Sequence, residues 1–255
     1  MNKTALIFAF LAVAGVSYAA DNVNVTPKPS YSVTSDFSYT SEYVFRGLKN
    51  SNAAFQGSVE VGQDDFRVGL WTSQPIDSKG GNYNNEIDFY AGYKLKLSRD
   101  LTADFVGTYY YYPESTGGVT HHSYELGVGG TYDLGGASPA LAGVSTSLYY
   151  YYDFRLRQQT LQASAGYSLA LKDFGTSLDF SVFLGTAKGN NLAPDTNYKV
   201  GESYNYYGIG LNIPYKLAEN AQVHAGVSYA LNDKFGYNYS PKSTIAFSAG
   251  VTIGF

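Results

Sequence analysis

The chain has 255 residues, no cysteine, 15% charged residues and a formal net charge of −4. The missing cysteines exclude disulfides and thiolate metal sites, and the mildly acidic balance argues against a nucleic-acid partner. Soluble domains average about 25% charged residues, so this chain is short of charge for a soluble protein. Its mean hydropathy is only −0.19. This value argues against a helical membrane protein, whose spans need about 20 consecutive apolar residues each. The composition favours a transmembrane β-barrel, in which only every second strand residue contacts lipid.

The first residues predict a secretory signal peptide that is not part of the fold. Lys3 supplies a positive charge, residues 5–16 an apolar stretch, and Ser17-Tyr18-Ala19 a cleavage site with small residues at both ends. We expect cleavage after Ala19, with Ala20 as the next best site. The chain then divides into a signal peptide (1–19), an extended lead-in beyond the inner membrane (20–30) and a barrel (31–255).

From residue 31 onward, apolar side chains alternate with polar or small ones in short stretches. A period of two is typical of a β-strand with two different faces. In the first stretch, Tyr43 and Phe45 are expected on the apolar face, and residues 47–52 are expected to form a loop. In chain order, the alternation predicts twelve strands, at residues 31–45, 55–61, 66–72, 86–97, 101–111, 123–134, 140–152, 161–171, 178–184, 207–213, 223–229 and 244–255.

The last stretch, residues 244–255, alternates apolar with small or polar residues and stops at Phe255. This ending resembles the terminal signature of bacterial outer-membrane β-barrels, in which the last strand closes the barrel. In those proteins the final Phe is read by the barrel-assembly machinery. The alternative interpretation is the final strand of a soluble β-sandwich.

Three features favour the barrel over the sandwich. The strand number is even, and the connections alternate between long and short from the first onward, as in single-chain bacterial barrels. The apolar face carries no charged residue in any predicted strand, and a Lys or Arg at the lipid midplane costs about 2–4 kcal/mol. We therefore predict an all-β fold: a single antiparallel up-and-down transmembrane β-barrel of twelve strands, with ten or fourteen as alternatives.

Aromatic residues gather near both ends of the predicted strands. The clusters Tyr109–Tyr112 and Tyr149–Tyr152 precede loops at one end. Two aromatic belts are typical of the two membrane interfaces, although ordinary strand propensity also favours tyrosine. The residues near the opposite end are Tyr31, Phe66, Tyr132, Tyr167, Tyr215 and Phe255.

Several short motifs, in the same order along the chain, resemble the TorF-type porin family, a group of predicted outer-membrane β-barrels. The similarity is good over about residues 31–113 and compatible afterwards. It implies an outer-membrane barrel and suggests a pore, and it transfers no substrate and no catalytic residue. The motifs are Ser41-Glu42-Tyr43-Val44-Phe45-Arg46-Gly47, Gln56-Gly57, Gly69-Leu70-Trp71, Asn85-Glu86-Ile87-Asp88-Phe89-Tyr90-Ala91-Gly92-Tyr93 and Tyr110-Tyr111-Tyr112-Pro113.

The predicted inner face is polar and carries more acidic than basic side chains. Charges inside a barrel need water or partners, so either an aqueous channel or a closed lumen with salt bridges fits. Twelve strands lie between the filled eight-stranded barrels and the open sixteen-stranded porins. The pore-lining candidates are Asp36, Glu42, Arg46, Glu60, Arg67, Trp71, Glu86, Asp88, Asp104, Glu125, Asp179 and His224.

Arg46 and Trp71 are the most informative of these candidates, because both are expected to face inward in the half nearer the outside. Together with Glu86 and Asp88 they are expected to form a constriction, in which the carboxylates hold the Arg46 cation. The equally good alternative is a structural salt bridge inside the lumen, with Trp71 filling space.

The preferred function is passive diffusion of small hydrophilic solutes or ions across the outer membrane, with a weak preference for cations. One alternative is a closed structural or adhesive barrel that acts through its extracellular loops. A lipid-active enzyme is a weaker alternative, based on the two-residue spacing of His121 and Ser123. No catalytic residue, cofactor or metal site is expected. The expected partners are outer-membrane lipid, the barrel-assembly machinery through Phe255, and small solutes.

Overall fold

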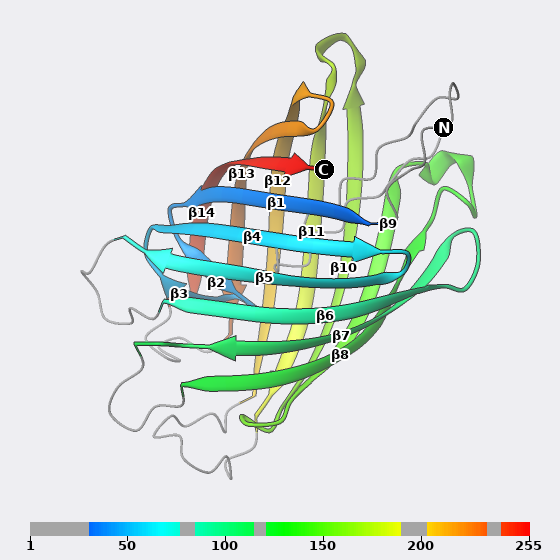
Figure 1. Cartoon of the computed structure of the whole chain (residues 1–255). Coiled ribbons are helices and arrows are strands. Elements are labelled where there is room, and N and C mark those ends of the chain that lie inside the picture. Colours follow the sequence, from blue (N-terminus) through cyan, green and yellow to red (C-terminus); the bar gives the residue numbers. More distant parts are fainter. Residues whose placement is uncertain (1–30, 77–84, 115–120, 190–202, 234–240) are drawn as a thin grey trace.

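Twelve antiparallel strands close into a barrel in the computed structural model of the chain (Figure 1). The structure describes residues 31–76, 85–114, 121–189, 203–233 and 241–255, so the predicted signal peptide and lead-in lie outside the described residues. The prediction of twelve strands is confirmed, and its alternatives of ten and fourteen are wrong. The wall strands are β1 (Ser32–Thr40), β4 (Ala54–Gln63), β5 (Phe66–Pro75), β6 (Glu86–Lys96), β7 (Leu101–Tyr111), β8 (His122–Asp133), β9 (Val144–Asp153), β10 (Gln158–Leu171), β11 (Thr176–Lys188), β12 (Tyr204–Ala218), β13 (Ala221–Asn232) and β14 (Ser243–Gly254).

The barrel closes where its first and last strands pair. The main-chain N–H of Val33 donates to the carbonyl of Phe255 at 3.0 Å, and the N–H of Phe255 returns a bond of 2.8 Å to Val33. Further along the same pair of strands, Asp36 lies opposite Thr252. Closure of this kind removes the exposed strand edges that would otherwise pair with other chains.

Apolar side chains cover the outside of the wall. Phe55, Leu126 and Phe247 are 58%, 57% and 60% exposed, whereas the preceding residues Ala54, Glu125 and Ala246 are buried. This alternation is the one that the sequence predicts, and such a continuous apolar surface is suited to hydrocarbon contact rather than to water. Among the described residues, no helix is long and apolar enough to cross a membrane.

The two ends of the barrel differ in their connections. We call the end with Ser32 and Gly254 the terminal end, and the opposite end the hairpin end. Two 3₁₀ helices, η1 (Pro139–Leu141) and η2 (Lys172–Phe174), lie in turns at the terminal end. The predicted strict alternation of loop lengths is wrong at one place. Because β9 and β10 extend further than expected, only residues 154–157 join them at the hairpin end, whereas the terminal-end connection 134–143 is longer.

The prediction of one long first strand over residues 31–45 is wrong. Strand β1 ends at Thr40, and the chain then forms a separate two-stranded hairpin of β2 (Tyr43–Phe45) and β3 (Leu48–Ser51) before β4 begins. The predicted loop at 47–52 therefore contains a strand. The alternation of apolar and polar residues does not reveal this break, because β2 continues the alternation of β1 although it leaves the wall.

Candidate functional site

The hairpin formed by β2 and β3, residues 43–51, is called the lumenal hairpin below. Phe45 pairs with Leu48, and the two residues between them have φ values of 49° (Arg46) and 76° (Gly47). Two successive positive φ angles define a tight type I′ turn. A non-glycine residue in this region is uncommon and persists only where its surroundings hold it, at a cost on the order of 1–3 kcal/mol.

The lumenal hairpin extends into the barrel. Its base leaves the wall between β1 and β4, where Thr40 and Ala54 are still paired. On the way inward, the ring of Tyr43 lies 5.4 Å from that of Trp71 on β5, and the ring of Phe45 lies 6.4 Å from that of Tyr110 on β7. The prediction that Tyr43 and Phe45 face lipid is therefore wrong, since both contact residues of the inner face.

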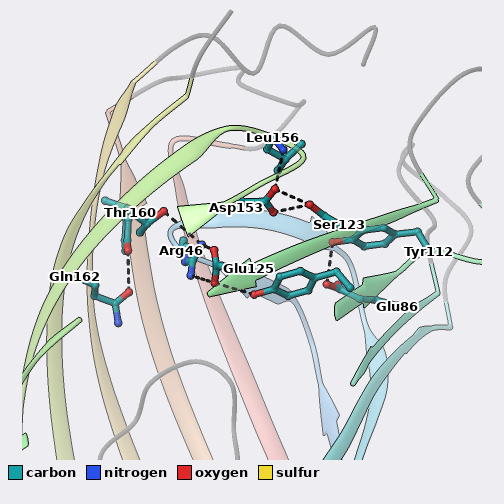
Figure 2. A network of polar contacts seen from close by, with 11 residues as sticks. Arg46, Glu86, Tyr112, Ser123, Glu125, Asp153, Leu156, Thr160 and Gln162 are labelled. Atoms are coloured by element: carbon teal, nitrogen blue, oxygen red, sulfur yellow. Dashed lines mark hydrogen bonds and ion pairs between the residues drawn. The ribbon is translucent and has the colours of Figure 1, made fainter. Parts of the chain in front are cut away.

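Arg46 at the tip of the hairpin reaches the far wall. Its two terminal nitrogens bind both carboxylate oxygens of Glu125 on β8, at 2.7 and 2.8 Å (Figure 2). Nη1 also lies 3.4 Å from the hydroxyl of Thr160 on β10, and the guanidinium carbon lies 4.5 Å above the ring of Tyr151 on β9. In a ring of twelve strands, the pair β9–β10 is diametrically opposite the pair β1–β4. The Arg46 side chain therefore reaches across the lumen, whereas the hairpin itself lies closer to β12, β13 and β14, where Asn232 binds Gly47.

The charged state of Arg46 follows from this environment. Burial lowers the pKa of Arg46, but the charge of the adjacent Glu125 carboxylate, its hydrogen bonds and the nearby Tyr110 and Tyr206 together raise the pKa well above its ordinary value. The guanidinium thus stays protonated. Both side chains are almost completely buried, at 8% and 4% exposure, and a buried two-bond pair between Arg and a carboxylate is among the strongest polar contacts in proteins.

On its other side, the tip of the hairpin is held by a neutral hydrogen bond and by close packing, with no charged group involved. The side-chain amide of Asn232 on β13 donates to the carbonyl of Gly47 at 3.0 Å. A Cβ atom on Gly47 would lie only 2.5 Å from the Cβ of Tyr206, so this position admits only glycine. Next to it, Leu48 packs against the buried cluster of Ala187, Tyr204 and Tyr206.

A patch of buried carboxylates lies beside the hairpin on β6. Glu86 accepts hydrogen bonds from the hydroxyls of Tyr43 and Tyr112. Asp88 is only 1% exposed, and neither of its carboxylate oxygens has a hydrogen-bond partner among the described residues. Its electrostatic neighbours include Glu86 and Glu125, which have the same charge. This corner of the lumen is strongly acidic.

Ser123 and Asp153 form a second polar contact close to the same end (Figure 2). The Ser123 hydroxyl lies 2.6 Å from both carboxylate oxygens of Asp153, which also accepts the main-chain N–H of Leu156 at 2.7 Å. These bonds stabilise the short turn between β9 and β10. His121 is exposed, and its Nδ1 lies 3.4 Å from the carbonyl of Tyr112, so the Ser123 hydroxyl is directed at an acid and not at this histidine.

The half of the barrel nearer the terminal end holds a second charged group, built from wall strands alone. Arg67 on β5 binds both carboxylate oxygens of Asp104 on β7, at 2.9 and 3.0 Å. Glu60 on β4 lies 3.8 Å from Arg67, and Tyr149 on β9 donates to Asp104 at 3.0 Å. Since Gly92 on the intervening strand has no side chain, the Arg67 guanidinium can lie directly over it.

Two smaller contacts complete the inner face of this half. The Nε2 atom of His224 lies 2.8 Å from Asp36, which also accepts a hydrogen bond of 2.7 Å from Thr252. Asp179 accepts bonds of 2.6 and 2.9 Å from Ser168 and Ser177. The described residues contain no group of three or more acidic or histidine side chains placed to hold a metal ion.

The structure places the predicted pore-lining residues inside the barrel, although their role in conduction stays a prediction. Glu42 belongs to the base of the lumenal hairpin and pairs with Lys49, rather than lining a wall strand. The predicted constriction needs a correction: Glu125 holds Arg46, because the hairpin carries Arg46 beyond β6. Glu86 binds Tyr43 and Tyr112 instead, and Asp88 has no hydrogen-bond partner among the described residues. Trp71 contacts the hairpin through Tyr43.

Sequence reasoning missed the residues that receive the hairpin. Tyr110 and Tyr151 belong to clusters assigned to an aromatic belt, but they are only 5% and 9% exposed and face inward. The alternation contains this signal, because every second tyrosine of a four-residue run must face the lumen. Asn232 and Thr160 carry no comparable signal, since a polar residue near a strand end is usual in any barrel.

The barrel is similar in fold to several solved outer-membrane proteins. The KdgM porin matches with a TM-score of 0.57 at 12% identity, over 87% of this chain and 99% of that chain. The NanC porin matches with a TM-score of 0.52 at 11% identity, over 87% and 98%. An outer membrane channel from Pseudomonas putida F1 matches with a TM-score of 0.53 at 10% identity, over 94% and 100%. At these identities the likeness establishes the barrel fold alone.

The comparison with sequence families gives a narrower result. No curated protein matches the chain at a significant level. The family described as "Bacterial protein of unknown function (Gcw_chp)" matches residues 24–199. That description does not include the TorF-type name, which therefore stays a resemblance. Because the match covers well over half of its residues, the chain belongs to the Gcw_chp family of bacterial proteins.

Proposed function

We propose that the protein is an outer-membrane channel for passive diffusion of small hydrophilic solutes or ions. The observation that carries this proposal is a closed barrel with an apolar exterior and a charged interior. In a closed barrel each wall strand is hydrogen-bonded to a neighbour on both sides, so no strand edge leaves its main-chain N–H and C=O groups unpaired in hydrocarbon. Charged side chains inside a barrel are typical of a lumen that admits water. The signal-peptide pattern of residues 1–19 supports the same location.

In this proposal the hairpin end faces outward and the terminal end faces the periplasm. Bacterial barrels have short periplasmic turns, and their longer connections are extracellular. The outer-membrane lipid contacts the apolar belt, and the assembly machinery recognises the last strand. Arg46 and its partners then lie in the extracellular half of the lumen, where an entering solute meets them first.

A weak preference for cations follows from the charges at the hairpin end. Glu86, Asp88, Glu125 and Asp153 are all buried there, and the guanidinium of Arg46 is bound to Glu125. One of the similar solved structures is titled as the KdgM porin in complex with disordered oligogalacturonate, a polyanion. The acidic lumen of this chain disfavours such a solute, so small cations or neutral solutes fit the proposal better.

A closed barrel that acts through its extracellular loops is the second candidate. The observation that favours it is the lumenal hairpin, which occupies the lumen and narrows it, with the Arg46 side chain bound to Glu125 on β8. The idea of a lipid-active enzyme is not carried further, since Ser123 is buried inside the barrel and bonded to Asp153.

Conductance of the refolded protein in a planar lipid bilayer tests the channel directly. We expect discrete current steps, and in a KCl gradient a reversal potential of the sign that K⁺ preference gives. A reversal potential of the opposite sign would remove the charge argument while leaving the channel in place. A protein that inserts with a folded barrel but never conducts would favour the closed barrel.

A further inference from the structure

We propose that the lumenal hairpin is the gate of this channel, held shut by the pair Arg46–Glu125, which we call the latch. The inference rests on the proposed channel and adds its regulation. The structure then shows the closed state, in which the gate occupies the lumen and the Arg46 side chain at its tip binds the wall opposite its base.

The first argument is that the hairpin is not needed for the barrel. The β1–β4 ladder runs without interruption to Thr40 and Ala54. One residue further, Ser41 binds the main chain of Phe247 on β14, and the carbonyl of Ala53 accepts the N–H of Ile76 after β5. Two residues in a tight turn are enough to connect strands that are paired in this way. Residues 42–52 are therefore an insertion into a finished wall.

The second argument concerns how the hairpin is held. Strands β2 and β3 pair with each other and form a sheet separate from the wall, so no ladder of main-chain hydrogen bonds ties them to it. Side chains of the described residues contribute to the attachment. They include the rings of Tyr43 and Phe45, the hydroxyl of Tyr43 on Glu86, the Leu48 contact, the Asn232 amide and the latch. A two-stranded hairpin alone is marginally stable. Its position therefore depends on these contacts, and it can be released while the barrel stays closed.

The third argument is the strain at the tip. Arg46 occupies a left-handed conformation with φ of 49°, which a side chain of this kind adopts only when its partners compensate. Those partners are Glu125, Thr160 and the ring of Tyr151, all on the far wall. The strained residue is thus the one that makes the longest reach across the lumen, as expected for a contact that opens and closes.

The central test replaces residues 42–52 by Asn-Gly, which keeps Ser41 and Ala53. Circular dichroism and the heat-dependent shift in gel mobility establish that the barrel has folded. We expect a steady current with a conductance about threefold or more above that of the wild-type steps, because the full lumen of a twelve-stranded barrel becomes available. Equal conductance and equal open time in both proteins would overturn the gate and leave the channel standing. If neither protein conducts, both proposals fail.

A second test locks the gate instead of removing it. The chain has no cysteine, so Phe45→Cys with Tyr110→Cys introduces one unique pair at a contact where the rings lie 6.4 Å apart. Bridging the pair with a short bis-methanethiosulfonate reagent should abolish the current, and reductant should restore it. The single Phe45→Cys variant with the same reagent is the control. A bridged protein that conducts as before would show that the hairpin does not need to move, which overturns the gate.

Discussion

Arg46 and Arg67 make nearly the same contact in two different halves of one barrel. Each binds both oxygens of a carboxylate at about the same distance: Arg46 binds Glu125 at 2.7 and 2.8 Å, and Arg67 binds Asp104 at 2.9 and 3.0 Å. Arg67 joins two strands of the wall, β5 and β7, whereas Arg46 joins the wall to a segment that is separate from it. The Arg46–Glu125 pair is also more deeply buried: its two side chains are 8% and 4% exposed, whereas those of Arg67 and Asp104 are 14% and 10% exposed.

The difference shows that the effect of a salt bridge depends on what it connects. Breaking a contact between wall strands leaves the strands paired by their main chains and changes the stability of the whole barrel. Breaking the contact at the hairpin tip leaves the wall intact and changes the position of the hairpin. The same substitution at the two arginines should therefore give two different measurements, one functional and one thermodynamic.

The largest expected effect is that of Arg46→Ala on the current. Removing one partner of a buried pair costs about 3–5 kcal/mol, because the other charge is left buried without compensation. Here the released hairpin can relieve that cost by letting water reach Glu125. We expect the open fraction in bilayer recordings to rise at least about tenfold, since 1.4 kcal/mol already corresponds to a factor of ten. Arg67→Ala is the matched control, and an equal rise in that variant would contradict the assignment.

Arg67→Ala should instead lower the stability of the barrel. The wall keeps Asp104 in place, so its carboxylate loses the cation and keeps the hydrogen bond from the Tyr149 hydroxyl. Since this pair is partly exposed to water, the expected loss in the free energy of unfolding is about 2 kcal/mol rather than the full cost of a buried pair. Urea unfolding in lipid vesicles measures it. Arg46→Ala should change the unfolding midpoint less, because the wall unfolds with or without a docked hairpin.

Asp88→Asn tests the acidic corner next to the hairpin. The carboxylate of Asp88 is buried, has no hydrogen-bond partner among the described residues and lies near two like charges. A carboxyl group that is buried without a partner beside like charges takes up a proton rather than remain ionised. Replacing it with an amide of the same shape therefore removes no charge, and we expect the reversal potential in a KCl gradient to stay where it is, as it should in Ser123→Ala. A reversal potential that moves toward zero in Asp88→Asn alone would show that Asp88 is ionised.

The sequence predicts the wall well, because the bilayer imposes a strict rule on it. Within each wall strand, every second residue faces lipid and has to be apolar, as Phe55 and Phe247 are, and this constraint applies to all twelve strands. The lumenal hairpin obeys no such rule. Tyr43 and Phe45 continue the alternation of β1, so periodicity extends the strand through them, although the chain turns inward at Ser41 and Glu42.

The pairing of Arg46 with Glu125 could not be predicted from the sequence for a related reason. The sequence analysis assigns Glu86 and Asp88 to Arg46, whereas the choice of Glu125 depends on how far the Arg46 side chain reaches across the lumen. That distance is a property of the closed ring of strands. The dipeptide Arg46-Gly47 between Phe45 and Leu48 is the one local indication of a tight turn, and it is weaker than the usual Asn-Gly or Asp-Gly.

The smallest effect is expected at His224, on the wall of the terminal half. His224 contacts Asp36 at 2.8 Å, but Asp36 also accepts a bond from Thr252 across the β1–β14 seam. Because one partner remains and both side chains of the pair keep some exposure, at 18% and 12%, His224→Ala should lower the free energy of unfolding by about 1 kcal/mol or less. Thr252→Val should have a similar effect, and the double variant should cost more than the sum, because Asp36 is then left without either partner. Additive losses in urea unfolding would mean that water replaces both bonds, and that the terminal half of the lumen is wetter than the hairpin half.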